Sequence, residues 1–152
     1  MTLTEQILRA VFGAFAGTVG FAMLVHVPKR SILVSGLIAS FSYLVYLGLT
    51  LLGIPDPMAV FVGSLAGSLA GLLSARLMKI IGTVFLMSAV VPVVPGLGLY
   101  RMMAFFGQGQ IASGAATGIE TMITVVMIAL GIGAGAFVDR LIWSRSVRKH
   151  AV

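Results

Sequence analysis

The sequence has no cysteine and very few charged residues, and both absences narrow what the chain can be. With no cysteine among 152 residues, disulfides, thiolate metal sites and cysteine nucleophiles are excluded. Charged residues make up 9% of the chain and hydrophobic residues 59%, whereas globular domains average roughly 45–50% apolar residues. A water-soluble fold of this composition would expose a mostly apolar surface, which soluble monomers rarely do. Together with a mean hydropathy of +1.13, this predicts a membrane protein.

Residues that support catalysis or metal binding are also scarce. The chain has four acidic residues and two histidines, His26 and His150. In the sequence they form no nucleophile–base pair and no metal-ligand cluster, so we expect no enzyme activity, no catalytic residue, no metal and no cofactor. The net charge of +6 does not indicate a nucleic-acid partner, because the basic residues stand singly or in pairs between long apolar runs.

The charged residues divide the chain into apolar runs close to the length that crosses a bilayer. A transmembrane helix needs about 20 apolar residues, and glycines and prolines mark the breaks between the runs. The sequence thus predicts an all-α, polytopic membrane protein whose single transmembrane domain covers residues 1–152. Its five expected helices lie at approximately 8–26, 32–53, 57–76, 80–106 and 114–141.

The basic residues indicate the orientation of these five spans. Eight of the ten lysines and arginines fall on one side of the membrane, which the positive-inside rule assigns to the cytoplasm. We therefore expect the N-terminus outside and the C-terminus in the cytoplasm, whereas four spans would scatter the charges over both sides. The eight residues are Lys29, Arg30, Arg76, Lys79, Arg140, Arg145, Arg148 and Lys149.

The third span carries a small residue at every fourth position, including Gly63, Gly67 and Gly71. Small residues at this spacing let helix backbones approach each other closely inside a membrane. These glycines are predicted to pack helices together, with no direct part in function.

The fourth span is interrupted near its middle by two prolines and two glycines. Proline removes a backbone donor, and irregular backbone at membrane depth is tolerated only where protein covers it or where it lines a cavity. In transporters such breaks hold substrates and ions, so we expect a Pro/Gly-broken fourth helix beside a substrate path. A simple proline kink is the alternative. The candidate substrate-binding residues are Ser88, Pro92, Pro95, Gly96, Gly98 and Tyr100, of which Ser88, Pro92, Gly96 and Tyr100 would share one helical stripe.

Two charged residues near the end of that span complete the candidate site. Arg101 and Glu120 lie within or beside apolar runs, and charges inside a membrane are expensive and often functional. Arg101 is predicted to bind a substrate carboxylate and Glu120 to carry a proton. In the alternative, both residues only mark the membrane boundary. Asp56 is assigned to a loop, and Asp139 to an ion pair with the adjacent Arg140.

Two segments resemble one known protein family. Residues 20–28, Gly-Phe-Ala-Met-Leu-Val-His-Val-Pro, are similar to its GFAM-x-x-x-VP pattern, and residues 92–100, Pro-Val-Val-Pro-Gly-Leu-Gly-Leu-Tyr, to its P-x-x-PG-x-x-x-Y pattern. The family is the threonine/serine exporter (ThrE) family, and the likeness extends over nearly the whole chain. In particular, the chain resembles the short YjjB-like branch, which is similar to the second half of the full-length exporters.

The resemblance implies a subunit of an inner-membrane exporter of small carboxylate-bearing metabolites, either threonine and serine or C4-dicarboxylates such as succinate. Among the candidate residues it points to Pro92, Pro95, Gly96 and Tyr100. Because the sequence lacks the first half of the long exporters, the resemblance also implies a separately encoded first-half subunit (YjjP-like) or further copies of the chain as partners. A membrane scaffold that transports nothing and a passive channel are the alternatives.

Overall fold

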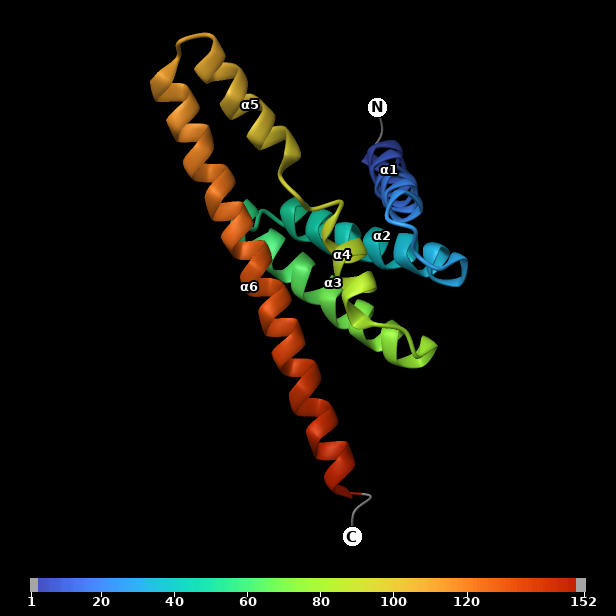
Figure 1. Cartoon of the computed structure of the whole chain (residues 1–152). Coiled ribbons are helices and arrows are strands. Elements are labelled where there is room, and N and C mark those ends of the chain that lie inside the picture. The colour runs from blue at the N-terminus through green and yellow to red at the C-terminus, as the bar shows by residue number, and fades with distance from the viewer. Residues whose placement is uncertain (1–2, 150–152) are drawn as a thin grey trace.

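The computed structural model describes residues 3–149 as six α-helices joined by short connections (Figure 1). The expected all-α fold is confirmed, whereas the expected count of five helices is not. The side chains of Arg145, Arg148 and Lys149, and all of His150, lie outside the described residues. The helices are α1 (Leu3–Leu24), α2 (Lys29–Leu51), α3 (Asp56–Met78), α4 (Gly82–Val90), α5 (Gly96–Gly107) and α6 (Ile111–Lys149).

Four of these helices are long and apolar enough to cross a membrane, namely α1 over Ile7–Leu24, α2, α3, and α6 over Ile111–Ile142. The chain is therefore a multi-pass membrane protein. Helix α4 has 9 residues and α5 has 12. At about 1.5 Å per residue, each is shorter than a hydrocarbon core of about 30 Å. The region 80–106, expected as one broken helix, thus holds two helices that are each too short to span alone.

The interruption between α4 and α5 covers residues 91–95, and its prolines explain it. Pro92 and Pro95 have no backbone N–H to continue a helical ladder. The N–H groups of Val93 and Val94 both bond the carbonyl of Val90, at 2.9 Å and 3.1 Å, and α4 ends in this turn. The chain therefore leaves one helix and starts another in a new direction (Figure 1).

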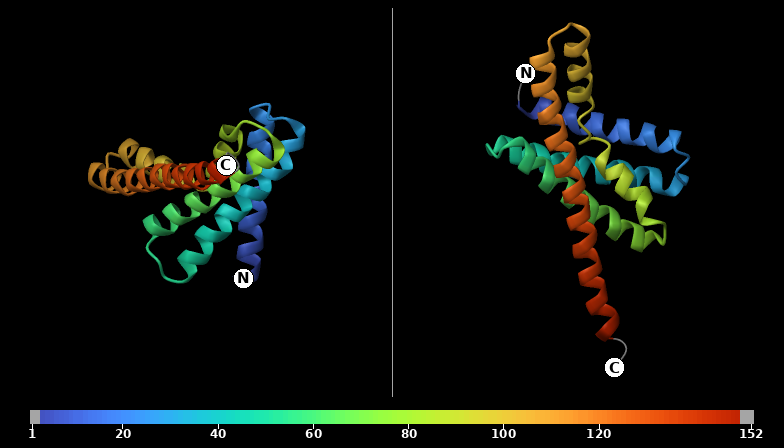
Figure 2. Two further views of the ribbon diagram at one scale, coloured as in Figure 1. Left: turned by 90° about the horizontal axis from the view of Figure 1, so that it is seen from below. Right: turned by 60° about the vertical axis from the view of Figure 1, so that its left-hand side comes forward.

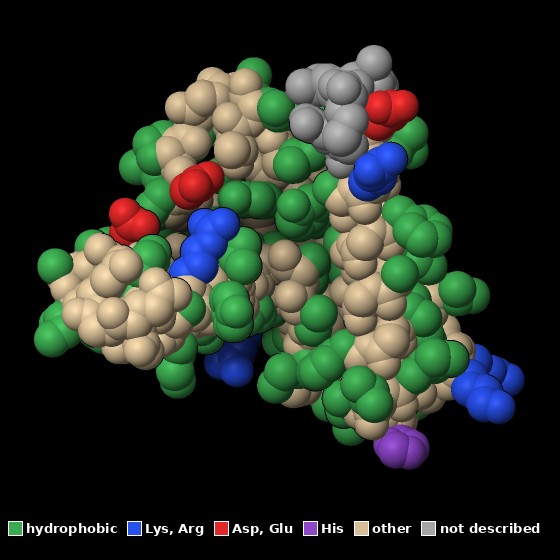
Figure 3. Space-filling view, turned by 90° about the horizontal axis from the view of Figure 1, so that it is seen from above, with side chains coloured by type: hydrophobic (Ala, Val, Ile, Leu, Met, Phe, Trp, Pro, Cys, Tyr) green, Lys and Arg blue, Asp and Glu red, His purple; other side chains and the backbone are tan. Residues whose placement is uncertain are grey.

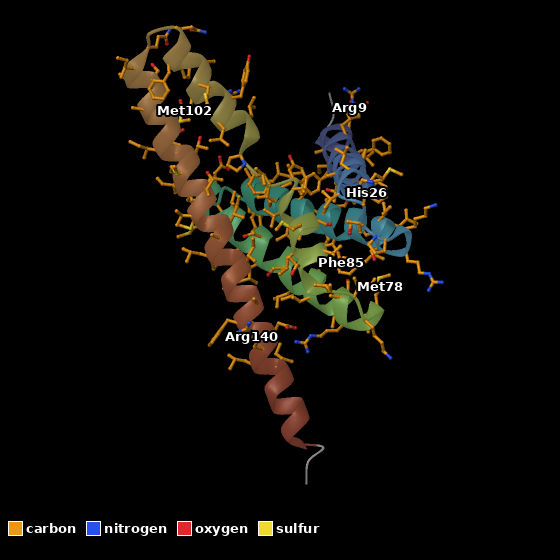
Figure 4. All side chains as sticks on the ribbon, in the orientation of Figure 1. Arg9, His26, Met78, Phe85, Met102 and Arg140 are labelled. Carbon is orange, nitrogen blue, oxygen red and sulfur yellow. The ribbon has the colours of Figure 1, made fainter. Side chains whose placement is uncertain are left out.

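Helix α3 is the centre of a helical body formed by α1 to α4. It packs on α2, α4 and α6, and Gly63, Gly67 and Gly71 are buried where it meets α2 and α4. A Cβ added at Gly63 would lie 3.2 Å from the carbonyl oxygen of Ser42, and one at Gly71 would lie 3.3 Å from the backbone of Phe85. Phe85 has no exposed surface and sits at the middle of the body (Figure 4). The glycines thus lie where neighbouring helices approach most closely.

Helix α6 crosses α3 at an angle, and the two chains run in broadly the same sense (Figure 2). Ser64 of α3 contacts Gly131 of α6, and further along both helices Arg76 forms an ion pair with Asp139. Among the described side chains, the expected pair of Asp139 with Arg140 is not found, because the end of α3 brings the Arg76 guanidinium to this carboxylate. Since α3 and α6 run in broadly the same sense, the chain between them must return across the molecule.

Helices α5 and α6 form a hairpin that stands away from the helical body (Figures 1 and 2). Helix α5 packs chiefly on α6 and has no buried residue. Small residues of α6 lie under large ones of α5: a Cβ added at Gly114 would lie 2.8 Å from the Phe106 ring, and one at Gly118 would lie 2.9 Å from the sulfur of Met102 (Figure 4). The hairpin is therefore held by its own two helices.

Candidate functional site

A cavity of about 480 Å³ lies where the beginnings of α3 and α5 meet the first half of α6. Three charged side chains line it, Asp56, Arg101 and Glu120, and we call it the charged cavity. Figure 3 shows acidic and basic side chains gathered between hydrophobic ones on one face of the molecule. The other lining residues are Pro57, Pro95, Gly98, Thr117, Thr121, Ile123 and Thr124.

Prolines determine where two of the charged residues lie. Helix α3 begins at Asp56, directly after Pro55, and α5 begins at Gly96, directly after Pro95. A proline immediately before a helix ends the preceding segment, because its ring and its missing N–H prevent a continuous helix. As a result, Asp56 occupies the first turn of α3, and Arg101 lies in the second turn of α5.

Helix α6 contributes one polar face to the charged cavity. Thr117, Glu120, Thr121 and Thr124 are three or four residues apart and therefore share a side of the helix. The threonine hydroxyls donate to carbonyls four residues earlier, at 2.9 Å for Thr117, 2.7 Å for Thr121 and 3.0 Å for Thr124. Because each hydroxyl has used its hydrogen, its oxygen can still accept a hydrogen bond from a ligand.

The start of α5 gives the cavity a positive side. The backbone N–H groups of Leu97 and Gly98 have no acceptor within the part of the chain that the structure describes. Unpaired amides in a first helical turn carry a partial positive charge. Gly98 also lets α5 approach α6, because a Cβ at this position would lie 2.5 Å from the Thr121 hydroxyl. Arg101 adds a full positive charge one turn further on.

The charges in the cavity are not paired with one another. Among the described residues, no ion pair joins Arg101 to Glu120 or to Asp56. The side chains of all three residues are exposed in the isolated chain. The guanidinium and the Glu120 carboxylate are therefore available to a ligand that carries charges of both signs, whereas the Asp56 carboxylate also interacts with the Tyr46 hydroxyl.

The other predicted site residues are not brought to this cavity. Ser88 is buried and bonds a carbonyl of its own helix, α4. Pro92 lines a different cavity, against α1. Gly96 is exposed, and the Tyr100 side chain is 70% exposed and lines no described cavity. The expected stripe is not formed, because residues 91–95 interrupt the helical register between α4 and α5.

Asp56 is the cavity residue that sequence reasoning missed. It stands between two prolines, which suggested a loop, but it is the first residue of α3. One feature of the sequence could have revealed Asp56. It lies just after an apolar run and at the place where the next helix begins. Its proximity to Arg101 and Glu120 depends on the parallel packing of α3 and α6, which no local pattern reports.

Comparisons with known proteins place the chain beside transport proteins. A family model described as "Threonine/Serine exporter, ThrE" matches residues 10–138. A curated protein of Mycobacterium tuberculosis (strain ATCC 25618 / H37Rv), named "Probable threonine/serine exporter", is 28% identical over 139 residues. That match covers 91% of this chain and 26% of the relative, so the chain spans about a quarter of the relative's length. No solved structure matches the chain.

Proposed function

This chain belongs to the threonine/serine exporter family, and from that membership we propose that it is a subunit of an inner-membrane exporter of small carboxylate-bearing metabolites. The observation that carries the proposal is the charged cavity. Its volume of about 480 Å³ lies within the range of roughly 300–1,000 Å³ that is usual for small-molecule sites. A transporter accounts for these residues better than an enzyme does, because the cavity offers binding groups and no nucleophile–base pair.

We propose that α4, residues 91–95 and α5 together make one return crossing of the membrane. The parallel direction of α3 and α6 supports this, because one return is needed between them. The chain then crosses five times, with the N-terminus outside and the C-terminus in the cytoplasm. This topology puts Lys29, Arg76, Lys79 and Arg140 on the cytoplasmic side, in accord with the positive-inside rule.

In this topology the charged cavity lies toward the outer side, beside the broken crossing. Its residues come from the start of α3, the start of α5 and the first half of α6. Three helices that each contribute one wall can change the cavity by tilting against one another, which alternating access requires. The substrate path proposed here therefore runs past Pro95 and Gly98.

The arrangement of charges favours an α-amino acid over a dicarboxylate. The substrate carboxylate would bind Arg101 and the amides at the start of α5, and the ammonium group would bind Glu120 and Asp56. Acidic charges exceed basic charges in the cavity, so a second substrate carboxylate would be repelled and an ammonium group attracted. The threonine hydroxyls of α6 would accept a hydrogen bond from a substrate hydroxyl. Threonine or serine is thus the proposed substrate, and a C4-dicarboxylate such as succinate is the second candidate.

The test is export of labelled threonine and labelled succinate from preloaded cells. The cells express this chain with or without a separately encoded subunit that corresponds to the rest of a full-length exporter. We expect threonine to leave faster than succinate, and only when both subunits are present. Export by this chain alone would favour a homo-oligomer.

Other outcomes would contradict the proposal. If neither compound is exported in either condition, the scaffold alternative remains. A scaffold should still assemble with its partner after a Pro95→Ala change. If the rate of efflux is unchanged when the proton gradient is removed, a passive channel is favoured. Preferential export of succinate would overturn the assignment of Asp56 and Glu120 to an ammonium group.

A further inference from the structure

A small cavity lies between the end of α1 and α4, and it shares no lining residue with the charged cavity. Its volume is about 250 Å³. Helix α1 packs chiefly on α2 and makes few contacts with α4, which leaves room between the two. The lining is mostly apolar, and we call this space the α1–α4 cavity. The lining residues used below are Ala22, Val25, His26, Pro28, Met87 and Ser88.

The α1–α4 cavity opens at the surface of the helical body and is apolar at depth. Ala22 and Ser88 are 1% and 2% exposed and form its deep side, whereas Val25 and Met87 are 58% and 61% exposed. The Ser88 hydroxyl already donates to the carbonyl of Val84 at 2.9 Å. The deep side therefore needs no polar partner and suits an apolar group that enters from the surrounding membrane.

His26 adds one polar group to this lining, and it does so from a strained position. It is exposed, and it follows the last turn of α1 with φ at +57° (Figure 4). The N–H of Val27 bonds the carbonyl of Ala22 at 3.0 Å across it. Glycine is the usual residue at such a helix end, because the left-handed conformation disfavours other residues. A histidine kept here places an imidazole, which can donate a hydrogen bond, beside the apolar lining.

The α1–α4 cavity lies at a basic end of the helical body. Lys29 and Arg30 begin α2 directly after Pro28, which lines the cavity. Lys79 lies in the α3–α4 connection, and Figures 1 and 2 show this connection at the same end of the body as the α1–α2 connection. All three basic side chains are exposed and form no ion pair among the described residues. Neither connection contains an acidic residue, so this end attracts anions.

An apolar cavity beside exposed cations at the end of membrane-spanning helices has the chemistry of a phospholipid site. Basic pockets between transmembrane helices bind anionic headgroups. We propose that the α1–α4 cavity binds an anionic phospholipid, whose phosphate contacts His26, Lys29 and Arg30 and whose acyl chain lies between α1 and α4. In the topology proposed above, this end faces the cytoplasmic leaflet, where anionic lipids carry the negative surface charge. The site does not depend on which metabolite is exported.

Charge argues against two other occupants. Copies of the chain inserted in the same orientation would bring the same basic end to the same side of the membrane, so Lys29 and Arg30 of each copy would face like charges. An amino-acid substrate would find no partner for its ammonium group, because no carboxylate is among the described lining residues.

The test is equilibrium binding of spin-labelled phosphatidylglycerol to the purified full chain in phosphatidylcholine nanodiscs, with spin-labelled phosphatidylcholine as the reference. We expect phosphatidylglycerol to bind about 30-fold more tightly, because each of two cations near a membrane surface contributes a factor of about five. The Lys29→Gln/Arg30→Gln double variant should lose most of this preference. Arg30→Gln alone should weaken binding about fivefold. Its matched control is Arg9→Gln, an exposed arginine near the start of α1 that should bind normally.

Two further variants separate the cavity from general surface charge. Val25→Trp fills the cavity without changing any charge and should weaken phosphatidylglycerol binding at least as much as Arg30→Gln does. His26→Gly removes the imidazole and should weaken binding about fivefold. It should not lower the midpoint of thermal unfolding, because glycine suits this backbone conformation. Glycerol phosphate, which has the headgroup chemistry without acyl chains, should not displace the lipid.

Three results would overturn the proposal. The first is equal binding of the two lipids by the wild-type chain, a comparison that needs no variant to fold. The second is unchanged binding in a folded Val25→Trp variant, which would show that charge alone holds the lipid at the surface. The third is displacement by glycerol phosphate, which would show that the acyl chain takes no part.

Discussion

The two halves of α6 pack on different neighbours and differ in the room that they leave for a ligand, although they form one continuous helix. The first half packs on α5, lines the charged cavity and carries Glu120 among threonines. The second half lies on α3, where Gly131 and Gly135 are buried and where Asp139 is engaged with Arg76. Close backbone contact leaves no room for a ligand in the second half, whereas the first half lines a cavity and carries Glu120, which forms no ion pair within the described chain. We therefore assign anchoring to the second half and substrate binding to the first.

The largest expected effect is on stability, and it comes from disrupting the contact between the second half of α6 and α3. A Cβ at Gly131 would lie 2.6 Å from the backbone carbonyl oxygen of Phe61, so Gly131→Leu must push α6 away from α3. Overpacking of this kind costs about 3 kcal/mol, or roughly 10 °C in the midpoint of unfolding. Thermal unfolding and the yield of monodisperse protein measure the effect. Gly133→Leu is the matched control, since a Cβ there meets nothing within 4 Å, and equal damage by both changes would refute the assignment.

The next effect concerns substrate binding in the charged cavity, which the first half of α6 lines together with α5. Arg101→Gln should weaken threonine binding about 10- to 100-fold, because a charge-assisted hydrogen bond contributes roughly 1.5–3 kcal/mol. The midpoint of unfolding should not change, since Arg101 is exposed and forms no ion pair within the described chain. Equilibrium binding to the purified protein gives both quantities. Arg9→Gln replaces an exposed arginine of α1 outside the charged cavity and should bind threonine normally; equal weakening by the two changes would remove Arg101 from the site.

A smaller effect is expected on discrimination between substrates. Asp56→Asn removes one of the two carboxylates from the charged cavity, so the preference for threonine over succinate should fall about tenfold. The ratio of the two export rates measures this preference. Glu5→Gln is the control, because Glu5 lies on α1 outside the charged cavity. An unchanged ratio in Asp56→Asn would show that this carboxylate does not contact the ammonium group.

The smallest effect is expected at the ion pair that ends the anchored half. Arg76 and Asp139 keep 30% and 19% of their side-chain surface exposed, and partly exposed pairs contribute about 1 kcal/mol or less. Asp139→Asn should therefore lower the midpoint of unfolding by about 3 °C and leave threonine affinity unchanged. The adjacent Arg140→Gln is the control. A loss of affinity in Asp139→Asn alone would mean that the two halves of α6 are coupled.

Patterns along the chain predicted the packing of α3 better than they predicted the charged cavity. Small residues at Gly63, Gly67 and Gly71 recur every four positions, and the structure buries all three. Apolar runs and proline positions likewise indicated where most helices begin and end. These features are local, because helix length, spacing and backbone donors depend on neighbouring residues.

The charged cavity could be predicted only in part. Arg101 and Glu120 stood out because charges are rare in apolar runs, but Asp56 joins them only through the parallel packing of α3 and α6. The proposed stripe through Ser88 and Tyr100 assumed a continuous helical register. Residues 91–95 destroy that register, and no spacing rule states the direction in which α5 leaves the turn.

The most direct test of substrate binding in the charged cavity uses the absence of cysteine from the chain. A single cysteine introduced by Thr117→Cys would line the cavity, and its rate of modification by a maleimide can be measured with and without saturating threonine. We predict that threonine slows this reaction several-fold and leaves Thr83→Cys, on the exposed side of α4, unaffected. Equal rates at Thr117→Cys with and without threonine would contradict substrate binding at this site.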